Sequence, residues 1–421
     1  MGEVVIDLGD AAVPAPVSDR PAPWLSLARW LGVVVALAGL LCLGGSAPPA
    51  APARLVWSLS AVSQYAMSAE VLVTHDADTR VLAAYRIADG TRLWQREGLV
   101  NPIFFVVGDR LGLGLNPDQP ILTNTWLDLA TGRAGASFAD DVLAVAPDGW
   151  FITSVADEAG SRLARVSPDT GERQSLLTFA PGVLWVTDPA VRRVAWWGTD
   201  GVLRQRDLAT GAETRRDLGL RPGSWAHVGR ASGGWLVTRQ TDEGVRVTLA
   251  GDADLAPRWS RVLPGGPGLV VVDSFYAHAW GCGPVVCVAS SARGTHVLDL
   301  ADGRVLRMVD NDLMSAEPSA WQLVNAGIEG DRVFSTVINM ATGELPYPAW
   351  QSRGRVTGAI PGYLLGVRLD DRTLLGVLDV TTGQLRPVPA VPGDNFCELA
   401  RPYLVCRDET EPETVRIWHA G

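Results

Sequence analysis

One short phrase recurs along this 421-residue chain at intervals close to 40 residues, and this periodicity limits the chain to a repeat fold. The phrase consists of an apolar residue, a second residue that is often Asp, two further residues, a Thr or Asp, and a final Gly. Successive copies lie 39 to 42 residues apart, except for one step of 92, which has room for two units and holds a degraded copy near Gly251. The phrases end at Gly90, Gly132, Gly171, Gly211, Gly303, Gly343 and Gly383.

Each phrase predicts a tight turn between two antiparallel strands. The Asp side chain can accept hydrogen bonds from backbone amides two residues further on. A Gly in the last position accepts the positive φ that closes the turn with a bulge. Two more apolar runs precede each turn, such as residues 103–107 and 111–115. Each unit is therefore predicted to be four short strands, and no sustained helical periodicity follows residue 50.

Four strands in a period of 40 residues predict an all-β chain folded as a β-propeller. Stacking the sheets buries each face on the next, and closing the ring removes most sheet edges. Residues 414–419 form a strand with no hairpin partner after it, and residues 54–59 form one with no partner before it. We therefore expect the first strand, which carries Trp57, to complete the last blade beside Trp418. The turn phrases and the split blade add up to nine units, but the repeat register is poor in two of them. We expect eight blades and leave seven and nine open.

The phrase D-x-x-T-G followed by a Trp resembles the repeat of pyrroloquinoline-quinone-type propellers, and the resemblance covers residues 54–421. That family includes quinone-dependent alcohol and sugar dehydrogenases, and also non-enzymatic relatives such as the outer-membrane assembly lipoprotein propeller. In the family, a Trp four residues after the Gly docks on the neighbouring blade. Here only Trp94 holds that place, and the equivalent positions are Ala136, Ser175, Arg215, Arg307, Tyr347 and Pro387.

The residues before the repeats predict a membrane anchor. Residues 1–23 are polar and rich in Pro and Ala, and we expect them to form a disordered tail. Residues 24–45 supply an apolar segment long enough for one transmembrane helix, with Cys42 as a residue of that helix. Residues 46–53 are a Pro/Ala linker, which we expect to be extended.

The charges around the apolar segment predict its orientation. Arg20 and Arg29 precede the apolar run, and the next Arg is Arg54. The positive-inside rule then places the tail in the cytoplasm and residues 54–421 outside the cell. A cleaved signal peptide, with its cut near Gly45-Ser46-Ala47, is the alternative.

Four of the five Cys are arranged as two hairpin pairs. Cys397 and Cys406 flank Arg401-Pro402 symmetrically, so a hairpin centred there would place them directly opposite and near disulfide reach. Cys282 and Cys287 flank residues 283–286 in the same fashion. Such pairs can oxidise and persist outside the cell. We expect both disulfides, and free buried thiols are the alternative, chiefly for the Cys282 pair.

No group of residues has a clear catalytic pattern. A quinone dehydrogenase needs a calcium site of carboxylate and amide oxygens. The nearest cluster, residues 75–78, falls in a turn, where we expect it to be solvated. The acidic residues near Pro412 predict a wet loop, and the five His show no metal-ligand spacing. His278 is the most site-like of them, although we favour a structural role. We expect no catalytic, cofactor-binding or metal-binding residue and no cofactor.

The sequence therefore predicts a single-pass bacterial membrane protein whose extracellular propeller is a non-catalytic binding or scaffolding module. The partner would be a protein or a glycan on one propeller face. The net charge of −10 argues against nucleic acid, which pairs its phosphates with basic surfaces. The alternatives are a divergent quinoprotein oxidoreductase and a sensor that passes an external signal inward.

Overall fold

The computed structural model is all-β in the residues that it describes. These residues are 53–114, 124–183, 185–188, 192–198, 200–219, 226–241, 243–264, 278–290, 294–309, 319–329, 332–357, 362–369, 372–393, 395–408 and 411–420. The expected tail, transmembrane helix and all but the last residue of the linker lie outside them. Within these ranges no helix has the length and apolar character needed to cross a membrane.

Six separate sheets each contain four consecutive antiparallel strands. Their strands are β2 (Gln64–Met67), β3 (Val71–Asp76), β4 (Val81–Arg86) and β5 (Arg92–Arg96); β6 (Ile103–Val107), β7 (Arg110–Gly114), β8 (Asn124–Asp128) and β9 (Ala134–Phe138); β10 (Asp141–Val145), β11 (Phe151–Asp157), β12 (Gly160–Val166) and β13 (Arg173–Phe179); β14 (Trp185–Thr187), β15 (Arg193–Trp197), β16 (Val202–Asp207) and β17 (Glu213–Asp217); β18 (Ala226–Ala231), β19 (Gly234–Thr241), β20 (Gly244–Gly251) and β21 (Pro257–Pro264); and β22 (His278–Cys282), β23 (Val285–Ser290), β24 (Gly294–Asp299) and β25 (Val305–Val309).

The remaining strands form a pair and a larger sheet. The pair is β26 (Trp321–Glu329) with β27 (Arg332–Asn339). The larger sheet has eight strands, namely β28 (Gln351–Thr357), β29 (Gly362–Leu369), β30 (Arg372–Asp379), β31 (Leu385–Pro392), β32 (Asn395–Ala400), β33 (Tyr403–Asp408), β34 (Val415–His419) and β1 (Arg54–Leu59). It joins two four-stranded groups, because β28 and β32 pair in parallel through Val356–Leu399 and Thr357–Ala400.

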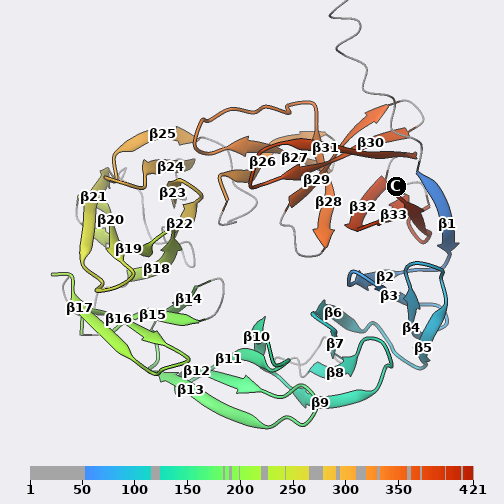
Figure 1. Cartoon of the computed structure of the whole chain (residues 1–421), viewed down its shortest axis with the longest axis horizontal. Coiled ribbons are helices and arrows are strands. Elements are labelled where there is room, and N and C mark those ends of the chain that lie inside the picture. Colours follow the sequence, from blue (N-terminus) through green and yellow to red (C-terminus); the bar gives the residue numbers. More distant parts are fainter. Residues whose placement is uncertain are drawn as a thin grey trace, which may run out of the picture. The chain divides into compact units, whose positions relative to one another are not determined.

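Each strand group packs on the next one along the chain through one cluster of buried apolar side chains. The cluster of Val73 and Leu111, for example, joins the β2–β5 sheet to the β6–β9 sheet. Nine such clusters follow one another, and the cluster of Leu72 and Ile417 joins the last group back to the first. Figure 1 shows the sheets in chain order, with β1 beside the C-terminal strands. This is the organisation of a multi-bladed β-propeller, as the repeat predicts.

The described strands fall into nine groups, which is one of the two counts left open beside the expected eight. The segment between Gly211 and Gly303, where the sequence has room for two units, holds two four-stranded sheets, β18–β21 and β22–β25. The turn of the β18–β21 sheet ends at Leu255, four residues later than the sequence predicts. Gly251 holds the position of the usual Asp, and the residue with positive φ is Leu255, at +57°.

The β26–β27 pair has no fourth strand among the described residues. The chain after the turn at Gly343 runs through Pro346 and Pro348, which cannot donate backbone hydrogen bonds to a ladder. Thr336 of β27 instead donates its hydroxyl to the carbonyl oxygens of Tyr347 and Trp350, at 3.3 and 3.1 Å. The segment that follows β27 is thus attached to this strand by hydrogen bonds of the Thr336 side chain and not by a backbone ladder.

Candidate functional site

The recurring turns have one geometry throughout the described chain. All seven glycines of the phrase have φ between +68° and +76°. In each turn the Gly amide donates to the carbonyl oxygen four residues earlier, as Gly132 does to Asp128 at 2.8 Å. A side chain with Cβ is strained in this conformation, so Gly is the residue that closes the turn at least cost.

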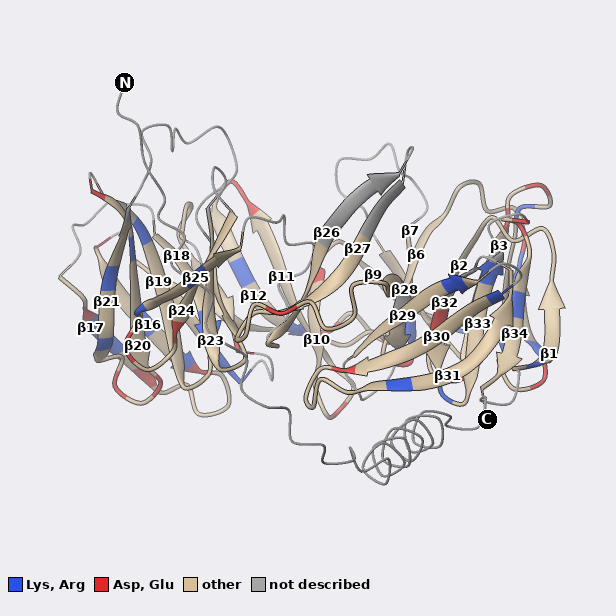
Figure 2. Cartoon of the chain, turned by 90° about the horizontal axis from the view of Figure 1, so that it is seen from above, with Lys and Arg blue, Asp and Glu red and all other residues tan. Residues whose placement is uncertain are grey.

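Four of the seven phrases carry an Asp four residues before the Gly, and its carboxylate accepts hydrogen bonds from the turn. Asp207 accepts hydrogen bonds from the amides of Ala209 and Thr210 and from the Thr210 hydroxyl, at 2.8 to 3.0 Å. The hydrogen bonds from Thr210 lower the pKa of the Asp207 carboxyl below its usual value. Asn339 takes the same place after β27 and accepts from the amides of Ala341 and Thr342. Figure 2 shows many acidic residues on such turns at the ends of the sheets.

Tryptophans on the outer strands dock on the turns of the next sheet. The indole nitrogen of Trp94 in β5 donates to the carbonyl oxygen of Leu129 at 2.8 Å. Its ring lies over Gly132, where an added Cβ would come within 2.7 Å of Trp94 Cγ. Trp259 of β21 repeats both contacts with Leu300 and Gly303, through a hydrogen bond of 2.9 Å. These joints lock neighbouring sheets together.

Sequence reasoning missed Trp259 because it placed the degraded turn on Gly251. Counted from Leu255, which has the turn's positive φ, Trp259 stands four residues later, like Trp94 after Gly90. The signal was therefore present but was read in the wrong register.

Other side chains occupy some of the remaining docking positions. Arg307 donates to the carbonyl oxygen of Ala341 at 2.7 Å, and the Tyr347 hydroxyl donates to that of Gly383 at 3.0 Å. At Ala136 the joint is made by the backbone, whose amide donates to the Pro168 carbonyl oxygen at 2.8 Å. The loss of Trp from these positions thus does not remove contact between the sheets.

Between the β14–β17 and β18–β21 sheets a polar network makes the joint. Gln205 donates to the carbonyl oxygen of Asp252 at 3.1 Å and accepts from the indole nitrogen of Trp235. Arg230 pairs with the Asp252 carboxylate and lies 4.6 Å from the Trp235 ring centroid. The exposed Arg215, four residues after Gly211, makes no side-chain hydrogen bond to another described residue of this joint.

The first and last strands of the propeller pair with each other. In the antiparallel register of β1 and β34, Leu55 lies opposite Trp418 and Trp57 opposite Ile417. Trp57 then docks on Gly90 of the first sheet. The guanidinium of Arg407 adds a second tie, because it donates to the carbonyl oxygens of Val62 and Ser63 at 3.2 to 3.4 Å.

The structure places both Cys pairs as disulfides. Cys397 and Cys406 lie directly opposite in the β32–β33 hairpin, whose turn is Arg401-Pro402 as expected. The second hairpin differs from expectation, because it turns at Gly283-Pro284, so that Cys282 faces Val285 and Cys287 faces Trp280. Cys282 and Cys287 are diagonal neighbours, and their Cα atoms are 5.9 Å apart.

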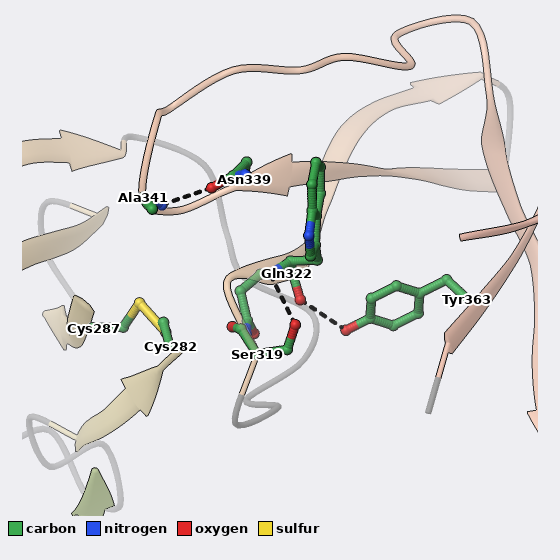
Figure 3. Close-up of a disulfide and its surroundings, with 8 residues drawn as sticks. Cys282, Cys287, Ser319, Gln322, Asn339, Ala341 and Tyr363 are labelled. Atoms are coloured by element: carbon green, nitrogen blue, oxygen red, sulfur yellow. Dashed lines mark hydrogen bonds between the residues drawn. A yellow bond between two sulfur atoms is a disulfide. The ribbon is translucent and has the colours of Figure 1, made fainter. Parts of the chain in front are cut away.

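Both disulfides are buried between sheets, and the four Cys are fully shielded from solvent. Figure 3 shows Cys282–Cys287 near Ser319 and Gln322, the residues that begin the next strand group. Gln322 donates to the Ser319 carbonyl oxygen at 2.7 Å. The disulfide hairpins are therefore parts of the joints and not surface features.

The other clusters that the sequence singled out have structural contacts. His75 is buried in β3, where its ring nitrogens approach Ser63 Oγ and the Leu99 carbonyl oxygen at 3.2 and 3.1 Å. Asp76 caps the following turn through Thr79, whose hydrogen bonds lower the pKa of the Asp76 carboxyl. The side chain of His278 lies outside the described residues, as do the side chains of Asp408 and Glu409. Glu411 pairs with Arg416 at 2.5 Å, and Glu413 is exposed.

Within the described ranges no three acidic, His or Cys side chains are grouped as metal ligands.

The first strands of two neighbouring sheets expose apolar side chains. Ile103 and Phe105 of β6 are 41% and 37% exposed, and Leu143 and Val145 of β10 are 39% exposed each. Both strands are edges of their sheets. A Cβ on Gly108 would lie 3.5 Å from Val145 Cγ2, which shows that the two sheets meet here. We call these four side chains the first-strand apolar surface.

Phe105 is fixed in place by its own sheet. It lies opposite Gly112, and an added Cβ on Gly112 would come within 2.8 Å of the Phe105 ring. Its ring makes an edge contact with Trp126, at 5.5 Å between centroids. The missing side chain at Gly112 therefore lets Phe105 contact the buried Trp126, so that this part of the surface is rigid.

The fold and its joints define the class of the chain as a multi-bladed β-propeller. No protein-family model matches the chain, and no curated protein sequence matches it. Among solved structures, BamB from Moraxella catarrhalis is 12% identical, with 85% of this chain and 84% of that chain covered and a TM-score of 0.34. The Dos1 propeller is 10% identical, with 88% and 96% covered and a TM-score of 0.40. The dihydro-heme d1 dehydrogenase NirN is 14% identical, with 79% and 66% covered and a TM-score of 0.36.

Proposed function

We propose that this chain is a membrane-anchored extracellular β-propeller that works as a non-catalytic binding or scaffolding module. In this proposal the nine strand groups are nine blades of a pyrroloquinoline-quinone-type repeat. The partner is a protein that presents apolar side chains to the first-strand apolar surface. The observation that carries the proposal is the exposure of Ile103, Phe105, Leu143 and Val145 on the first strands of two neighbouring sheets.

Two physical arguments support this choice of surface. Scattered exposed apolar residues are normal, but several of them on the edge strands of two neighbouring sheets are typical of a surface that binds another molecule. The ring of sheets is also held by repeated side-chain joints, so that little conformational entropy is lost when a partner binds. A rigid frame with an apolar binding surface suits a scaffold.

Photocrosslinking in the native membrane tests the surface. A photoreactive residue at position 143 is compared with one at position 308, because Met308 of β25 is 46% exposed but lies on an outer strand. We expect one discrete protein adduct from position 143, its loss in the Ile103→Asp variant, and no such adduct from position 308. No adduct at 143, or the same adduct at both positions, would overturn the proposal.

The expected anchor and orientation are part of the same proposal. They rest on the apolar segment at residues 24–45 and on the arginines before it. Protease shaving of whole cells should release fragments of residues 54–421. Fragments only after the cells are broken would place the propeller inside.

A further inference from the structure

Two arginines lie directly opposite each other in the β18–β21 sheet. Arg239 of β19 and Arg246 of β20 are cross-strand partners. Such partners have Cβ atoms about 4.5–5.5 Å apart, and two like charges in this position destabilise a sheet. Both side chains are only partly exposed, and the Nε atom of each is buried with no hydrogen-bond partner among the described residues.

Neither arginine has a carboxylate partner in the part of the chain that the structure describes. By contrast, other partly buried arginines are paired: Arg165 with Asp148, Arg204 with Asp200 and Arg230 with Asp252. A partly buried guanidinium without a counter-ion is costly, because its charge loses water without gaining a partner. Among the described residues, the Arg239–Arg246 pair therefore lacks a negative group.

The pair faces the neighbouring β14–β17 sheet. Val237, two residues before Arg239, is in the cluster that joins the two sheets, whereas Val245, beside Arg246, is in the cluster on the opposite face. Because side chains alternate along a strand, Arg239 and Arg246 share the face of Val237. Both therefore look toward the β14–β17 sheet.

The β14–β17 sheet has further hydrogen-bond donors on the face that packs against the β18–β21 sheet. Leu203 belongs to the joining cluster, and Arg216 of β17 lies opposite it, so that Arg216 shares its face. Trp197, also opposite Leu203, is 5% exposed, and its buried indole nitrogen has no hydrogen-bond partner in the part of the chain that the structure describes. All these residues lie toward the ends of their strands that are far from the turns at Gly211 and Leu255. This edge of the joint thus carries cationic and neutral donors from both sheets.

We propose that Arg239 and Arg246 bind an oxyanion group of a ligand at the joint between the β14–β17 and β18–β21 sheets. The ligand group is a phosphate, sulfate or carboxylate, whose oxygens match the planar forks of the two guanidiniums. Trp197 and Arg216 supply further donors for an oxyanion at this edge. The bound anion removes the repulsion between the two arginines.

Titration calorimetry of the intact chain in detergent tests the proposal. Inorganic phosphate, sulfate and acetate are titrated separately at constant ionic strength, with chloride as the background anion. We expect at least one of them to bind with a dissociation constant of about 1 mM or below, and the Arg239→Gln/Arg246→Gln variant to bind it at least about tenfold more weakly, because each charged hydrogen bond contributes about 1.5–3 kcal/mol.

A matched variant controls for the loss of charge. Arg92 and Arg215 are exposed arginines outside this cluster, and Arg92→Gln/Arg215→Gln removes the same two charges. We expect that variant to keep the wild-type affinity. Equal weakening in both double variants, or no binding of any of the three anions by the wild-type chain, would overturn the proposal.

If the Arg239→Gln/Arg246→Gln variant binds no anion, thermal unfolding shows whether it has lost the binding site or its folded structure. Without added anion we expect Arg239→Gln/Arg246→Gln to melt at or above the wild-type temperature, because the repulsion is gone. A lower melting temperature for this variant and an unchanged one for Arg246→Lys would show that the arginines serve packing instead, and would also overturn the proposal.

Discussion

The indole nitrogen of Trp57 donates a hydrogen bond of 2.8 Å to the carbonyl oxygen of Ile87. Trp57 belongs to the strand that completes the last sheet, and Ile87 lies just before the turn of the first sheet. The same relationship joins Trp94 to Leu129 and Trp259 to Leu300. The contact that closes the propeller is thus the ordinary joint between neighbouring sheets.

The joint predicts different costs for two similar substitutions. Gly132 and Gly98 both have positive φ, +68° and +76°, but an added Cβ meets Trp94 only at Gly132 and open space at Gly98. Gly98→Ala should cost about 1–2 kcal/mol from backbone strain alone. Gly132→Ala should cost about 1–3 kcal/mol more, because the Trp94 ring must move. Urea unfolding measures both, and equal losses would show that Trp94 does not dock on Gly132.

Leu255 has two opposing roles that a substitution can separate. Its φ of +57° is strained for a side chain, yet it is fully buried in the cluster that joins its sheet to the preceding one. Leu255→Gly should relieve about 1–2 kcal/mol of strain but lose about 2–5 kcal/mol of packing. We expect a net loss of stability by urea unfolding. A gain would mean that the turn conformation, not the packing, dominates at this residue.

The turn phrase predicted most of the fold because it depends on local chemistry. Gly and Asp at fixed spacing determine φ and the hydrogen bonds of a turn without help from distant residues. In the β18–β21 sheet the phrase predicts the unit but places its turn four residues too early, because burial of Leu255 outweighs the turn preference for Gly. Whether a Leu in a turn is buried depends on the neighbouring sheet, which the spacing of the phrase alone does not show.

The turn carboxylates predict a loss of stability in acid. Hydrogen bonds from Thr210 lower the pKa of Asp207 in the folded chain. A carboxyl with a lowered folded pKa stabilises the fold above its unfolded pKa, and this contribution is lost as the pH falls through the folded value. The melting temperature should therefore fall below about pH 4.

Two variants of Asp207 separate charge from hydrogen bonding. Asp207→Asn keeps an acceptor, as Asn339 does in its own turn, and should melt with a weaker dependence on pH in acid. Asp207→Ala loses the acceptor and should melt at a lower temperature at neutral pH as well. Thermal melts followed by circular dichroism across the acid range check both. An unchanged acid dependence in Asp207→Asn would exclude this carboxylate as a source of the effect.

The two buried disulfides predict that none of the four sulfurs reacts with an alkylating reagent, even after the chain is unfolded. Alkylation after unfolding without reductant should find Cys282, Cys287, Cys397 and Cys406 unmodified, because each is bonded. The Cys397→Ser/Cys406→Ser variant should lose about 2–3 kcal/mol through the loop it opens. Peptide mapping by mass spectrometry reports the pairing. Alkylated Cys397 or Cys406 would show free thiols.

The candidate sites were less visible in the sequence than the fold. Ile103 and Leu143 look like ordinary strand residues until the sheet edges on which they lie are known. Arg239 and Arg246 are seven residues apart and become neighbours only through the register of their hairpin. Both surfaces arise from contacts between strands or sheets, which composition and spacing do not encode.

The pairing of the first strand with the last is tested most directly by a cysteine pair at Ser58 and Arg416, which lie opposite in the β1–β34 register. We predict that Ser58→Cys/Arg416→Cys forms an intramolecular disulfide under mild oxidation, and that digestion without reductant yields one peptide containing both positions. Free thiols at both positions, or only bonds between separate chains, would contradict a propeller closed by its own first strand.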